Sequence, residues 1–125
     1  GMRRVVVSVT TDGSGDATAY TPPISGEIMS ITYVKPGAAS YTDGVDFALT
    51  NETTTEAIWT GTNVNATVTV HPRKAVVTEA QAAALYASGG VAVLDVMEIA
   101  QSRIKIVVAA GGASKVGAFH FHIKN

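Results

Sequence analysis

Short stretches in which apolar and polar residues alternate make up most of this chain, and Gly, Pro, Asn and Asp separate them. Such alternation is typical of β-strands that turn one face toward a core. The longest stretch covers residues 24–35, between Pro22-Pro23 and Pro36-Gly37. We expect this strand in the interior of a sheet, with the other strands arranged around it, because both of its faces carry apolar side chains. These are Ile24, Ile28 and Val34 on one parity and Met29, Ile31 and Tyr33 on the other.

Eight further stretches carry the same strand pattern. They cover residues 4–10, 17–21, 45–50, 56–60, 66–70, 91–100, 103–109 and 116–123. A helix is the alternative for residues 91–100. We favour a strand, because this stretch is rich in β-branched residues and the preceding Gly89-Gly90 ends the predicted helix. Eight or nine short strands at regular spacing predict a mainly all-β fold. We expect an antiparallel β-sandwich or a jelly-roll-like barrel, formed as one domain by residues 1–125.

One short helix is expected near residues 79–88. Thr78 and Gln81 match the spacing of a capping box, in which the two side chains satisfy free backbone donors at a helix start. The residues that follow are rich in alanine, and Gly89-Gly90 provides a stop.

The last two stretches are expected to pair as a hairpin over residues 103–123, with the turn at Gly111-Gly112. An antiparallel pair would set two apolar rows side by side on one buried face. The rows are Ile104, Ile106 and Val108, and Phe119, Phe121 and Ile123.

Charged residues make up only 15% of the chain, whereas 46% of its residues are hydrophobic. Soluble domains usually contain about 25% charged residues, so the deficit suggests that a partner covers part of the surface. The net charge of −1 provides no electrostatic attraction to nucleic acid or acidic lipid. No run of 18 apolar residues occurs, so no membrane span is expected, and cysteine is absent.

His120 and His122 are the sharpest candidates for chemistry. Histidines two positions apart on a strand share a face, and two imidazoles at that spacing can bind one metal ion. A third ligand would come from His71, Asp95 or Glu98. The simpler interpretation, which we favour, is a polar outer face opposite the row of Phe119, Phe121 and Ile123, with no metal bound.

Two further sets of residues could bind a ligand. Trp59, with Tyr41 and Tyr33, could form a platform for a sugar, although a lone tryptophan in a β-rich domain is usually part of the core. Aspartates beside glycine turns could bind calcium, although such residues more often cap their own turn. These are Asp12, Asp16, Asp43 and Asp46. No nucleophile triad or phosphate-binding loop is present, so we expect no catalysis and no cofactor.

Three segments, taken in order, resemble a family of small proteins encoded near the major capsid gene in tailed bacteriophages and prophages. The first combines residues 25–28 with 31–34, and the second leads from 42–47 to 53–58. The third runs through 71–75, 83–87, Gly89-Gly90, 104–109 and Gly111-Gly112. Together they span most of the chain.

The resemblance implies a virion-associated structural or accessory protein and not an enzyme. Its expected partners are other copies of itself or phage head proteins. Its expected location is the virion, and the bacterial host cytoplasm during assembly. A β-sandwich that binds carbohydrate or calcium is the competing hypothesis, because it would account for Trp59 and the aspartate turns.

Overall fold

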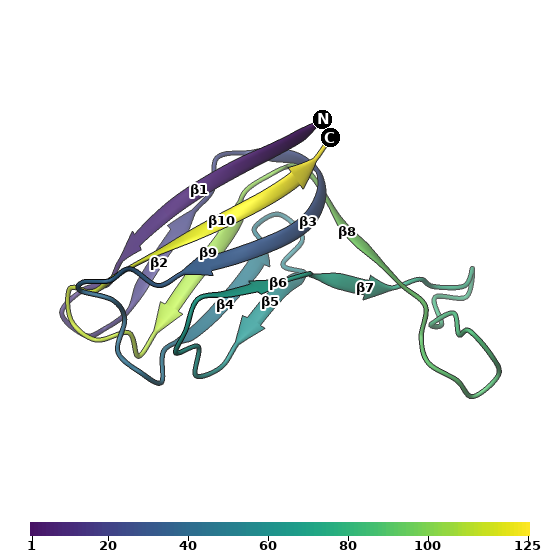
Figure 1. Cartoon of the computed structure of the whole chain (residues 1–125). Coiled ribbons are helices and arrows are strands. Elements are labelled where there is room, and N and C mark those ends of the chain that lie inside the picture. The colour runs from purple at the N-terminus through teal and green to yellow at the C-terminus, as the bar shows by residue number, and fades with distance from the viewer.

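The computed structural model describes residues 1–125, which form ten strands and no helix (Figure 1). The prediction of an all-β chain is confirmed, and all nine predicted strands are present within a few residues of their expected bounds. The strands are β1 (Met2–Thr10), β2 (Ala17–Tyr20), β3 (Ile24–Val34), β4 (Asp46–Asn51), β5 (Ala57–Gly61), β6 (Val68–Val70), β7 (Arg73–Ala75), β8 (Leu94–Ser102), β9 (Ile104–Ala109) and β10 (Val116–Lys124).

Two antiparallel sheets make up the architecture, and neither closes into a barrel. The larger sheet has the order β1-β10-β3-β8-β7, and β6 pairs with β3 as well. The smaller sheet has the order β2-β9-β4-β5. Figure 1 shows the two sheets as layers that face each other. Nineteen buried hydrophobic side chains form one cluster between them, so a sandwich-like arrangement replaces the alternative of a jelly-roll-like barrel.

Strand β3 lies in the interior of the larger sheet, as predicted. Strand β10 pairs along one edge of β3, while β8 and β6 share the other edge. Strand β3 contains a bulge at Met29, because His122 of β10 pairs with Ser30 while the next residue, Ile123, pairs with Ile28. The extra residue changes which alternate positions of β3 face the core. The buried positions therefore shift from Ile24 and Ile28 to Ile31 and Tyr33.

The predicted helix near residues 79–88 is wrong. These residues form turns and bends and, apart from Ala84, they are exposed. Thr78 and Gln81 build a turn in place of a cap, because the Gln81 N–H donates to the Thr78 carbonyl and the Ala82 N–H donates to the Thr78 hydroxyl. A helix of ten residues is marginal in water unless one face packs against a core. No core surface lies beside this segment.

The predicted hairpin over residues 103–123 is also wrong, although both of its apolar rows are buried. Strand β9 pairs with β2 and β4, while β10 pairs with β1 and β3, so the two rows face each other across the core. The link between them passes from one sheet to the other and bonds to Gly15 in the similar β1–β2 link. The alternation of apolar and polar residues identifies which face of a strand is buried. It does not show whether two successive strands pair as a hairpin or lie in different sheets, because both arrangements bury the same faces.

Replacing Phe121 by Ala should lower the melting temperature steeply. The side chain is fully buried, and such a truncation costs about 3–5 kcal/mol of the roughly 5–15 kcal/mol that stabilises a domain. His120→Ala and His122→Ala should cost far less, because both histidines face outward from the same strand. Thermal melting of the three variants measures the ranking, and the reverse order would contradict this assignment of faces.

Gly117→Ala should destabilise the fold by about 1–3 kcal/mol, the usual cost of overpacking a core. A Cβ atom there would overlap the Tyr41 ring and lie 2.8 Å from the Tyr33 ring. Gly13→Ala is the matched control, because no atom lies within 4 Å of its added Cβ. Urea unfolding compares the two variants. Equal unfolding midpoints would contradict the prediction, because they would show that the Tyr41 and Tyr33 rings shift to accommodate the added methyl group at little cost.

Candidate functional site

A long arm leaves the two sheets and is the most distinctive feature of the molecule (Figure 1). We define the arm as residues 73–96, which are β7, the tip 76–93 and the start of β8. Its base is a short ladder in which Arg73, Lys74 and Ala75 pair with Val96, Asp95 and Leu94. The sequence pattern missed β7, because His71-Pro72 interrupts the alternation and only three residues follow before the tip.

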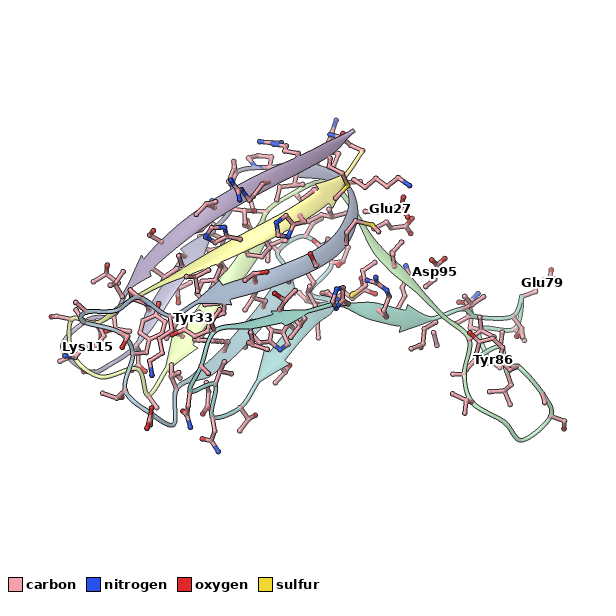
Figure 2. All side chains as sticks on the ribbon, in the orientation of Figure 1. Glu27, Tyr33, Glu79, Tyr86, Asp95 and Lys115 are labelled. Atoms are coloured by element: carbon pink, nitrogen blue, oxygen red, sulfur yellow. The ribbon has the colours of Figure 1, made fainter.

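Exposed apolar side chains gather on this arm. Tyr86 is 76% exposed and Val91 is 74% exposed, and Figure 2 shows Tyr86 and Glu79 near the far end, away from both sheets. Only three large hydrophobic residues are exposed elsewhere, namely Met2, Val6 and Tyr20. Contiguous exposed apolar surface on a protein usually marks an interaction site. The arm residues of this kind are Val76, Val77, Leu85, Tyr86, Val91 and Leu94.

Backbone hydrogen bonds give the arm its shape, since none of its residues belongs to the core cluster. The Val76 N–H donates to the Val93 carbonyl at 2.8 Å, and the Val93 N–H donates to the Ala84 carbonyl at 2.8 Å. At the base, the Arg73 guanidinium donates to the Met29 carbonyl at 3.2 Å. The arm is thus a formed element whose apolar side chains have nothing in the same chain to cover them.

A groove opens on the side of the sandwich where β5 and β6 lie. It has a volume of about 500 Å³ and is lined by residues 59–68 and Val70. Trp59 is partly exposed here and packs edge-on against Phe47, with ring centroids 5.6 Å apart. Val68 and Val70 pair with the buried residues Tyr33 and Ile31, so they lie on the inner face of their sheet. The groove therefore exposes the margin of the hydrophobic core.

Tyr41 and Tyr33 do not join Trp59 in a sugar-binding platform. Both are buried and their rings stack on each other at 6.0 Å. The Tyr41 hydroxyl donates to the Val9 carbonyl at 2.6 Å, and burial raises the pKa of this phenol. The structure thus places these two candidates in the core and leaves Trp59 as the aromatic residue of the groove.

His120 and His122 share the outer face of the larger sheet, as predicted. His122 Nδ1 lies 2.9 Å from the Ser30 hydroxyl. No third ligand joins them, and nowhere do three His, Cys, Asp or Glu side chains form a group that could hold a metal ion. Desolvation lowers the pKa of His120, and the nearby Arg4 and His122 lower it further.

The four aspartates named as calcium ligands do not gather into one site. Asp12 and Asp16 flank one turn, Asp43 lies in a second turn, and Asp46 is the first residue of β4. Asp12 accepts hydrogen bonds from the N–H groups of Ser14 and Asp16, and these bonds lower its pKa. Asp46 accepts from the Asn63 N–H at 3.0 Å. Asp43 lies 3.8 Å from the Lys35 ammonium.

The chain matches no protein-family model, no curated protein and no solved structure. It contains no helix that is long and apolar enough to cross a membrane. The geometry of the arm and the groove is therefore the basis for a functional argument.

Acidification should weaken the fold through His120. Because its pKa is lowered in the folded state, the unfolded chain takes up the proton more readily. Stability is complete above the ordinary histidine pKa of about 6.5 and declines as the pH falls from there toward the lower folded value. We expect a small loss between pH 7.5 and pH 5 in urea unfolding, and a smaller loss in His120→Gln. Equal losses in both proteins would contradict this role.

Proposed function

We propose that this protein is a structural or accessory component of a tailed-phage or prophage virion. It acts by associating with itself or with a capsid component, and it performs no catalysis. The observation that carries the proposal is the arm, a formed element with six uncovered large apolar side chains. An isolated protomer leaves this surface in water, whereas an assembled one buries it.

The energetics favour an assembled state. Burying a Tyr, Leu or Val side chain is worth roughly 1.5–3 kcal/mol when it moves from full exposure to full burial. Part of this gain is offset by the entropy lost on association. The arm side chains are exposed and few charges surround them, since Glu79 is the only charged residue between Lys74 and Asp95. The low charge content of the chain is consistent with the same picture.

The virion context comes from the resemblance described above. Its third segment covers much of the arm, including residues 71–75, 83–87 and Gly89-Gly90. One of the three segments that carry the resemblance therefore overlaps the unpartnered apolar surface.

Removing apolar surface from the arm should weaken association at least tenfold without unfolding the protein. The variant Tyr86→Ser/Val91→Ser alters two side chains that make no core contact. Sedimentation velocity compares it with the unmodified protein, alone and with its capsid protein. Val6→Ser is the control, because Val6 is 50% exposed on the outer face of the larger sheet. A strictly monomeric protein that ignores virion components would contradict the proposal.

A second candidate function is carbohydrate binding in the groove beside Trp59. The volume of about 500 Å³ lies within the usual range of ligand sites, about 300–1,000 Å³, and a partly exposed indole is a suitable stacking surface. Trp59 is the only tryptophan, so its fluorescence reports on this groove directly. Glycans that shift its emission and raise the melting temperature would support this function. Under our main proposal, neither signal changes across a broad glycan panel.

A further inference from the structure

We propose that the arm of one copy docks in the groove beside β5 of the next copy, so that copies join head to tail. This inference rests on the proposed function, because it specifies the surface to which the arm binds when copies assemble. It names two complementary surfaces on one chain, the tip 76–93 and the groove lined by residues 59–68 and Val70.

The groove suits an apolar occupant. None of its lining residues is charged. Trp59, Val64, Val68 and Val70 pack against the core from its margin, so a side chain inserted between them would extend the core of the receiving copy. Asn63 and Asn65 also line the groove, and both are uncharged.

Strand β5 lies at one edge of the smaller sheet and carries no charged residue and no proline. Exposed edges usually carry charged residues, prolines or very short strands that prevent pairing with another chain. Edge β1 carries Arg3 and Arg4, edge β7 carries Arg73 and Lys74, and β2 has four residues followed by a proline pair. Strand β5 reads Ala-Ile-Trp-Thr-Gly, with no charge and no proline. Its free backbone groups can therefore accept an added strand.

The arm has the properties that this edge and groove require. It carries one charged residue, Glu79, between Ala75 and Leu94, and its tip exposes apolar side chains on turns that isolated bridges connect. Val91 and Leu94 are exposed on the returning segment, while Leu85 and Tyr86 are exposed beside it. A segment with a single charged residue thus meets a groove whose lining residues are all uncharged, which keeps the cost of desolvating charges on docking low.

The arm projects away from the groove of its own copy (Figure 1). The loop 61–67 precedes β6, while the arm follows β6 and projects away from the sheets (Figure 1). From Val68 to Ala75 an extended chain covers roughly 20 Å, which carries the tip away from the groove. Donor and acceptor surfaces therefore lie at different ends of the molecule, and such contacts join copies head to tail into rings or filaments.

Arm-to-arm pairing about a two-fold axis is the main alternative for two copies. Antiparallel pairing through the free edge of β7, with the axis at Lys74, would set Lys74 of one copy directly opposite Lys74 of the other. Like charges directly opposite each other destabilise a strand pair. The groove beside β5 carries no such penalty.

Cysteine cross-linking tests the docking directly, because the natural sequence contains no cysteine. Tyr86→Cys places a thiol on the arm, and Thr62→Cys places one on the exposed lining of the groove. The two variants are mixed under mild oxidation, and the linked species are identified by mass. Thr18→Cys, exposed on edge β2, is the matched control for the groove variant. Sedimentation of the unmodified protein is measured in parallel.

We expect at least fivefold more heterodimer from Tyr86→Cys with Thr62→Cys than from Tyr86→Cys with Thr18→Cys. Equal yields, or a dominant Tyr86→Cys homodimer, would overturn the docking. If the unmodified protein still sediments as an oligomer in that case, the proposed assembly function survives and only this contact is wrong. A monomeric protein at every concentration would overturn both. As a second readout, Trp59 emission should change on dilution of the unmodified protein and stay constant in Tyr86→Ser/Val91→Ser.

Discussion

The Phe47 ring joins the two sheets, and the rest of the structure depends on this contact. Phe47 belongs to β4 in the smaller sheet, yet its ring centroid lies 4.8 Å from that of Tyr33 and 4.9 Å from that of Phe119 in the larger sheet. Both are edge-on contacts, a geometry that adds about 0.5–1.5 kcal/mol per pair beyond the burial of the rings. The aliphatic row of β9 and the remaining buried residues of β10, Phe121 and Ile123, belong to the same core.

The same ring connects the core to the surface that we assign to assembly. Trp59 packs on Phe47 from the open side of the sandwich, so the groove is the exposed margin of the core. The arm differs from the groove, because its apolar side chains are exposed and do not pack against the core. The chain thus has an open core margin on the sandwich and an uncovered apolar arm that projects from it. Under the proposed docking, one contact between copies would cover both surfaces.

Much of the fold could be predicted from the sequence, because alternation of apolar residues reports which strand faces are buried. Phe119, Phe121 and Ile123 were assigned to the core and His120 and His122 to the outer face on that basis, and the structure agrees. Alternation does not report which strands pair. It therefore failed to separate β9 and β10 into different sheets, and it did not reveal the bulge at Met29, whose effect depends on the register with β10.

The candidate site could be predicted only in part. Trp59 was identified as a ligand candidate, but its groove depends on where β5 and β6 end, which is a property of the assembled sheets. Residues 79–88 of the arm are predicted as a helix because Thr78, Gln81 and the alanines have suitable local preferences. Local preference decides the structure only when a packing surface supports it, and residues 79–88 have none.

Hydrogen–deuterium exchange of the arm at two protein concentrations tests the central claim most directly, namely that the arm is covered when the protein functions. At high concentration, or with virion components added, backbone amides of residues 76–93 should exchange more slowly than in dilute solution. Amides of β3 and β10 should exchange at the same rate in both samples, because they are already paired. Rapid exchange of the arm at every concentration and with every virion component would contradict the account.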